Sequence, residues 1–259
     1  MTQPSRASYQ ILTGQVPPVV ASRSARGRRA FLFLTGLMYL FVVAGFWPYW
    51  THGGRLTPPR PWVIHLHAFI YVGWMALLLA QVLLVSKQRV DVHRRLGKVG
   101  IAWGIVVLCM GLLVALIVPT LHVVRGEMGL DEAAAFLIIP LGDMILFGSL
   151  FTIAVLNRKD SDIHRPCILM ATVALMFAPV GRFAGPGGPL LILAVWMLPV
   201  IVAAAADWKR RPNTHPTYII GSLWMLLMFA RVAAMHTPFW LSRGRSIINA
   251  LQPAVDNFF

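Results

Sequence analysis

Long apolar runs separated by short polar loops form the dominant pattern of the chain. Because a segment of about 20 apolar residues is long enough to cross a bilayer as a helix, each run predicts a transmembrane helix. The pattern therefore predicts an all-α, polytopic bundle of seven transmembrane helices, at about 31–50, 63–86, 98–120, 133–156, 166–183, 188–206 and 217–236.

The composition supports a membrane protein. Of the 259 residues, 58% are hydrophobic and 12% are charged, and the mean hydropathy is +0.69. Ordinary soluble domains carry about 25% charged residues, so that class is excluded. The formal net charge of +14 does not indicate a nucleic-acid partner, since the basic residues lie between the apolar runs. The expected partner is the lipid bilayer.

Lys and Arg are concentrated in alternate polar segments. By the positive-inside rule, these segments lie in the cytoplasm, which predicts a cytoplasmic N-terminus and an outer C-terminus. A bacterial inner (cytoplasmic) membrane is the expected location, with an organelle transit peptide as the weaker alternative for the Arg- and Ser-rich start. The segments are 1–30, 87–98, 158–165 and 209–211.

Three regions follow from this pattern. Residues 1–30 are rich in Pro, Ser and Arg and are predicted to be a disordered, basic cytoplasmic tail. Residues 31–236 form the transmembrane domain. Residues 237–259 mix apolar and polar positions, which predicts an amphipathic segment on the outer surface or a simple tail. The two cysteines lie inside apolar runs and define no disulfide framework.

A four-residue unit occurs twice. Asp91-Val92-His93-Arg94 and Asp162-Ile163-His164-Arg165 both lie on the predicted cytoplasmic side, directly before an apolar run. Helices 2–3 and 4–5 could therefore be two hairpins related as a parallel repeat. In a structural interpretation, the aspartates cap helix N-termini and the arginines contact lipid phosphates. This interpretation leaves the histidines unexplained.

A functional interpretation of the unit begins with its histidines. His93 and His164 could ligate a haem iron (haem b) or a transition metal, because neutral imidazoles are common ligands of both. Asp91 and Asp162 would then orient the imidazoles, while Arg94 and Arg165 would neutralise propionates or an anionic substrate. An anion or lipid-headgroup site built from helix N-termini and arginines is the alternative.

The sequence around the repeated unit carries a resemblance. "HRRLGKVG" and "DIHRPCILMATVALMFAPVGR" resemble a bacterial family of predicted multi-pass membrane proteins of unknown function with paired HR motifs. In that family, an HRxxG segment after one helix is followed by an HRxxM-like segment after a later one. The matching residues are His93, Arg94 and Gly97, then His164, Arg165, Met170 and Arg182. The resemblance implies a membrane architecture. A looser similarity to b-type cytochromes and haem-handling membrane proteins rests on the histidines at helix ends.

A second polar group falls toward the predicted outer side. Asp143 lies well inside an apolar run, and Arg231 lies at a comparable depth in the last run. A charge inside the hydrocarbon region is costly, so we expect these two residues to form an intramembrane ion pair or a proton relay. His65 and His122 lie near the outer ends of their runs and, with Asp143, form a weaker candidate metal site.

These observations leave three hypotheses for function, and they leave open whether the protein is an enzyme. The first is a haem- or metal-associated redox or assembly protein. The second is a non-enzymatic transporter, or a protein that binds a lipid or a quinone. The third is a structural partner of a membrane complex. The sequence contains no Walker loop, dinucleotide GxGxxG, HExxH or GxSxG motif.

Overall fold

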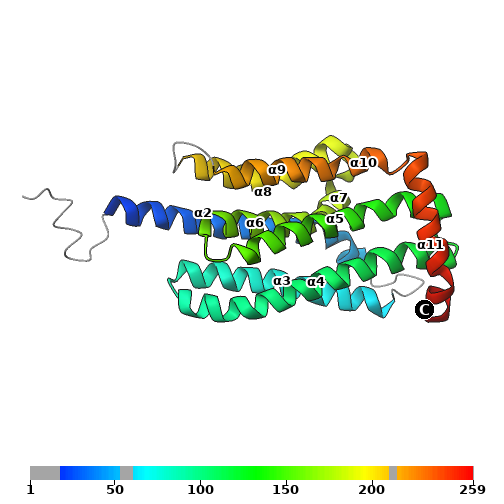
Figure 1. Cartoon of the computed structure of the whole chain (residues 1–259), viewed down its shortest axis with the longest axis horizontal. Coiled ribbons are helices and arrows are strands. Elements are labelled where there is room, and N and C mark those ends of the chain that lie inside the picture. Colours follow the sequence, from blue (N-terminus) through cyan, green and yellow to red (C-terminus); the bar gives the residue numbers. More distant parts are fainter. Residues whose placement is uncertain (1–17, 53–60, 210–214, 259) are drawn as a thin grey trace, which may run out of the picture.

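The protein is a bundle of long helices in a computed structural model that describes residues 18–52, 61–209 and 215–258. The long helices run side by side along one axis, and the C-terminal helix lies across one end of the bundle (Figure 1). This described part contains no strand. The predicted all-α class is therefore confirmed.

The helices follow the order of the apolar runs. They are α2 (Pro18–His52), α3 (Trp62–Ser86), α4 (Val90–Val124), α5 (Leu130–Leu156), α6 (Ser161–Leu175), α7 (Phe177–Ala184), α8 (Pro189–Trp208), α9 (Pro216–Phe229), α10 (Arg231–Ala234) and α11 (Pro238–Phe258). A short 3-10 turn, η2 (Gly185–Gly187), connects α7 to α8.

Six helical segments in the described part are long and apolar enough to cross a membrane, and the bent pair of α6 and α7 makes a seventh if it counts as one span. Their outward faces are apolar as well. Leu190 is 78% exposed, Phe69 is 68% exposed and Leu223 is 61% exposed. Water disfavours such a surface whereas lipid does not, so the architecture fits an integral membrane protein.

The core is densest around α5 and α6. Trp74 packs edge-on against Phe147 and Phe151, whose ring centroids lie 5.5 Å and 5.7 Å from it. The indole N–H of Trp74 donates to Thr172 Oγ1 at 3.3 Å, and that of Trp196 donates to the Val173 carbonyl at 2.7 Å. These bonds satisfy polar groups that have no access to water, which a lipid-embedded core requires.

The N-terminal helix begins earlier than predicted. α2 begins at Pro18, so residues 18–30 are helical rather than disordered. The rest of the predicted tail, residues 1–17, lies outside the described residues. Helical hydrogen bonding extends the first apolar helix backwards through the basic segment, because that segment contains no proline after Pro18.

The predicted fifth span is not one straight helix. α6 ends at Leu175, and the chain bends by 49° before α7 continues. Pro179 explains the break, because it has no N–H to donate to the Leu175 carbonyl and its ring would collide with that carbonyl. In the seventh span, the single turn residue Ala230 separates α9 from α10, but Pro216–Ala234 still counts as one span.

The C-terminal segment forms a helix across the end of α4 and α5. α11 lies at the opposite end of the bundle from the turn between α3 and α4 (Figure 1). Arg245 donates to both carboxylate oxygens of Asp131, at 2.5 Å and 2.7 Å, and Trp240 Nε1 donates to the Ala134 carbonyl at 2.8 Å. The hydrogen bond to Asp131 raises the pKa of the Arg245 guanidinium, so this residue stays charged.

Candidate functional site

The two DxHR units occupy the same register at the start of α4 and α6. The backbone N–H of His93 donates to the Arg89 carbonyl at 3.0 Å, and that of His164 donates to the Asp160 carbonyl at 2.9 Å. Each hydrogen bond runs from the histidine to the N-cap residue of its helix. The local geometry is therefore the same in both units, as a parallel relation of the two hairpins requires.

The predicted capping roles of the two aspartates are wrong. The N-cap of α6 is Asp160, whose Oδ1 accepts the backbone N–H of Asp162 at 2.8 Å. The N-cap of α4 is Arg89, which makes no capping side-chain bond. Both helices begin one residue before the aspartate, so Asp91 and Asp162 lie in the first turn, where they still complement the helix dipole.

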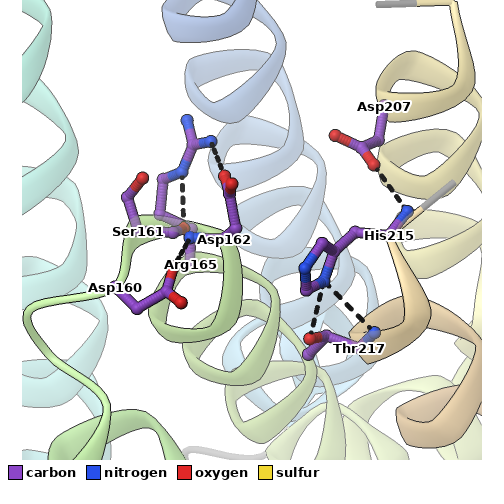
Figure 2. A network of polar contacts seen from close by, with 7 residues as sticks. All are labelled: Asp160, Ser161, Asp162, Arg165, Asp207, His215 and Thr217. Carbon is purple, nitrogen blue, oxygen red and sulfur yellow. Dashed lines mark hydrogen bonds and ion pairs between the residues drawn. The ribbon is translucent and has the colours of Figure 1, made fainter. Parts of the chain in front are cut away.

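The arginines of the two units have different surroundings. Arg165 lies 3.7 Å from Asp162 in an ion pair, and its Nε donates to the Ser161 carbonyl at 3.1 Å (Figure 2). Its guanidinium also lies 5.6 Å from the centroid of the Phe31 ring. Arg94 is exposed. Arg165 thus ties α6 to α2, whereas Arg94 points to the surroundings of the bundle.

The two histidines bond back to the preceding helix of their own hairpin. His164 Nδ1 lies 2.8 Å from the Ala154 carbonyl, which can only accept, so Nδ1 carries the proton and Nε2 the lone pair. The orientation of the Gln81 amide follows from its neighbours: when its oxygen faces the Gly97 N–H at 2.9 Å, its nitrogen donates to His93 Nδ1 at 2.5 Å. The neutral His93 ring then carries its proton on Nε2.

The different tautomers of His93 and His164 determine which ring nitrogen of each could bind a metal. A charge on His164 acts on the His93 imidazole. In the neutral state, however, only His164 presents an Nε2 lone pair to a metal. In the part of the chain that the structure describes, no group of three or more His, Cys, Asp and Glu side chains could hold a metal ion.

The predicted outer metal set is not brought together. His122 Nδ1 lies 2.5 Å from Glu127 at the turn that follows α4, and His65 is exposed on α3. Asp143 is bonded to Arg231 instead. Each of the three residues thus has a different environment, because α3, α4 and α5 place them at different depths and on different faces.

The predicted intramembrane ion pair is present. Asp143 of α5 accepts a hydrogen bond from Nη2 of Arg231 of α10, and the two residues are 7% and 6% exposed. Arg231 Nη1 donates to the Met228 carbonyl at 2.7 Å, and the guanidinium lies 4.7 Å from the centroid of the Phe177 ring. A buried charge is tolerated where such partners replace water.

One broken helix adjoins this ion pair. Phe177 is the first residue of α7, after the bend between α6 and α7, and its ring faces the Arg231 guanidinium. Arg231 follows Ala230, the single turn residue between α9 and α10, and Asp143 follows Pro140 by one turn inside the continuous helix α5. Broken helices beside polar groups inside a bundle are found at the ligand sites of secondary transporters.

Sequence reasoning missed the contribution of α3 to this centre. The Tyr71 hydroxyl lies 3.4 Å from the Val107 carbonyl and 3.5 Å from Met144 Sδ, and the Asp143 charge acts on it. The His67 ring stacks on Tyr71 with centroids 4.0 Å apart. The signal in the sequence was the spacing of four residues, which places His67 and Tyr71 on one helix face.

A second polar network was also missed, at the end of the bundle that carries the DxHR units. Asp207 of α8 is 8% exposed, and its Oδ2 accepts the backbone N–H of His215 at 3.0 Å (Figure 2). His215 caps α9, since its Nδ1 accepts the Thr217 N–H at 3.3 Å. The signal was an acidic residue at the end of an apolar run.

Comparisons with known proteins add no relative to this description of the chain. No protein-family model, no curated protein and no solved structure matches it. The fold and site define the class, a polytopic helical bundle fit for a membrane with a buried ion pair beside the break between α6 and α7. The resemblance to the paired-HR family and to b-type cytochromes stays a prediction.

Proposed function

We propose that the protein is a non-enzymatic membrane carrier whose ligand binds at the Asp143–Arg231 pair. The observation that supports this proposal is the position of the buried charge pair beside the α6–α7 break, where the Phe177 ring faces the Arg231 guanidinium. A purely structural ion pair has no need of a broken helix beside it. A break of this kind would let the short α7 shift relative to α5 while the rest of the bundle holds.

The energetics of the Asp143–Arg231 ion pair favour a role in which a ligand can replace one of its two partners. A buried ion pair contributes little net stability over apolar side chains, because the desolvation of both charges offsets their attraction. Keeping such a pair inside a membrane therefore points to a role beyond stability. A ligand that replaces one partner would keep the remaining charge neutralised. We further propose a bacterial inner membrane as the location, with the α11 end outside, in accord with the positive-inside distribution.

A labelling experiment tests the carrier proposal. Val232, next to Arg231, is replaced by cysteine in a background with Cys109→Ser and Cys167→Ala, and the protein is reconstituted in liposomes. A membrane-impermeant thiol reagent is then added either outside or inside the vesicles. A carrier that opens alternately gives labelling from both sides, whereas a static structural pair gives labelling from one side or from neither. Phe239→Cys, 73% exposed on α11, is the matched control and should react from one side only.

A haem- or metal-associated function is the second candidate. The observation that favours it is the hydrogen bond from His164 Nδ1 to the Ala154 carbonyl, because metal-bound histidines commonly donate in this way and keep Nε2 for the metal. Oxidised and reduced spectra and metal content of the purified protein test it. A reduced haem band lost in His164→Ala supports haem binding, and a colourless, metal-free, folded preparation contradicts it. Stoichiometric co-purifying subunits would instead favour a structural role in a complex.

A further inference from the structure

A row of polar side chains lies between the surface of the bundle and the buried ion pair. Arg182 of α7 is exposed, His67 and Tyr71 of α3 are half-buried, and Asp143 and Arg231 are buried. The His67 ring stacks on Tyr71 with centroids 4.0 Å apart, the Tyr71 hydroxyl lies 3.5 Å from Met144 Sδ, and Met144 adjoins Asp143 in α5. The charge of Arg182 acts on His67 from the surface. These contacts define a row of polar side chains between the surface of the bundle and the ion pair.

Two buried nitrogen atoms in this row of side chains lack hydrogen-bond partners among the described residues. They are Nδ1 of His67 and Nε of Arg231. A buried polar atom without a partner costs free energy, and native structures keep few of them. Arg231 is 6% exposed, and its Nε always carries a proton, so it can only donate. The centre therefore holds an unused donor that suits the oxygen of a ligand.

The charges and hydrogen-bond donors of this row of side chains favour the binding of an anion. Arg182, Arg231, His67 and Tyr71 can all donate hydrogen bonds, and Asp143 is the one carboxylate among them. Arg231 already binds a carboxylate, that of Asp143, so its site fits this group. The ring of Phe177 faces the guanidinium, and Met144 follows Asp143 in the core, so the surroundings suit an apolar tail.

We infer that the protein takes up a monocarboxylate with an apolar tail, together with one proton, along the path Arg182, His67, Tyr71 and Arg231. This inference rests on the proposed carrier function. The ligand carboxylate replaces Asp143 on Arg231, and Asp143 accepts the proton on its carboxylate oxygen. One O–H bond forms and one ion pair is exchanged for another, so the net charge at the centre does not change. An exchange that leaves the net charge unchanged costs less inside a membrane than one that adds a charge.

The protonation step depends on few groups. Arg231 of α10 is the charged group that acts on the Asp143 carboxylate, and Tyr71 of α3 is the other ionisable group in its field. Among the described residues, α4, α6, α9 and α11 also pack against α5 but bring no charged side chain to bear on Asp143. Protonation of Asp143 therefore removes the negative charge that attracts Arg231 and weakens the ion pair directly.

Equilibrium binding of radiolabelled benzoate to the purified protein tests the inference. Because one proton accompanies each anion, the dissociation constant should fall about tenfold per pH unit as the pH decreases through the range where Asp143 is ionised in the free protein. Asp143→Asn, which mimics the protonated carboxyl, should remove this pH dependence. Arg182→Gln should weaken binding about 5- to 10-fold, in the range of typical coupling free energies between charges and ligands. Arg125→Gln, an exposed arginine that follows α4, is the matched control and should bind like the wild type.

Competition identifies the source of the carboxylate. Displacement of benzoate by butyrate supports a water-soluble ligand, and displacement by oleate alone supports one drawn from the membrane. Benzyl alcohol, which lacks the carboxylate, should not displace benzoate. The inference is overturned if no carboxylate binds at any pH, or if binding is indifferent to both Arg182→Gln and Asp143→Asn. Labelling of the Val232→Cys protein from both sides remains an independent test, so a carrier that ignores carboxylates refutes this inference alone.

Discussion

The contact between Gly142 and Arg231 makes the sharpest prediction about the ion pair. A Cβ atom on Gly142 would lie 2.8 Å from Nε and 3.3 Å from Cζ of Arg231, and closer still to its Cδ. These atoms cannot move aside freely, because Asp143, the Met228 carbonyl and the Phe177 ring hold the guanidinium. Gly142→Ala should therefore push Arg231 away from Asp143.

The magnitude follows from two opposing effects. Removing one partner of a buried ion pair costs about 3–5 kcal/mol because the other charge is left uncompensated, and pushing the two charges apart has a comparable effect. Replacing a helical glycine by alanine stabilises a helix by about 1 kcal/mol. The free energy of unfolding of Gly142→Ala should therefore decrease by about 2–4 kcal/mol, the difference between these two effects.

Unfolding in mixed micelles, followed by circular dichroism during an SDS titration, measures this change. Gly148→Ala is the matched control on the same helix, because its Cβ would lie 3.3 Å and 3.4 Å from the flexible Leu108 methyl groups. Gly36→Ala on α2 has no neighbour within 4 Å and should be neutral or mildly stabilising. If Gly142→Ala is as stable as Gly148→Ala, Arg231 is not held against α5 and the reasoning fails.

Three further predictions concern the same elements. Asp143→Leu alone should decrease the free energy of unfolding by about 3–5 kcal/mol, whereas Asp143→Leu with Arg231→Leu should recover most of it and still abolish ligand binding, as an SDS titration and a binding assay would show. Asp160→Ala should cost about 1 kcal/mol through loss of the α6 cap and Asp162→Ala clearly less, and equal losses in the same titration would contradict the capping assignment. Gly244→Val should lift α11 from α5, since a Cβ there would lie 2.9 Å from the Ala134 carbonyl oxygen, and limited proteolysis should then cleave α11 faster than in Ser242→Val, an exposed neighbour.

The apolar runs predicted the helices well because membrane helices obey a simple constraint. Each span must satisfy its own backbone hydrogen bonds and present an apolar surface, so length and hydropathy suffice to find it. The helix breaks were harder to predict. Pro179 interrupts the fifth span, yet Pro140 and Pro199 lie inside helices that continue. Whether a proline breaks a helix depends on how neighbouring helices satisfy the freed carbonyl, which a single run does not show.

The candidate site was predictable only in part. Asp143 and Arg231 were paired correctly because two opposite charges at similar depth in a membrane have few other partners. The outer metal set failed because sequence position does not reveal which face of a helix a histidine occupies relative to distant helices. The capping roles of Asp91 and Asp162 failed because each helix began earlier than its apolar run.

The sequence by itself determined the class of the protein, the order of its apolar spans and the existence of charges that had to be paired inside them. The tertiary structure decided which faces meet. It placed Phe177, Asp143 and Arg231 at one point beside the break between α6 and α7, and it stacked His67 on Tyr71 of α3. The reason is physical, since hydropathy depends on local composition alone. The meeting of three helices depends on packing between residues far apart in the chain.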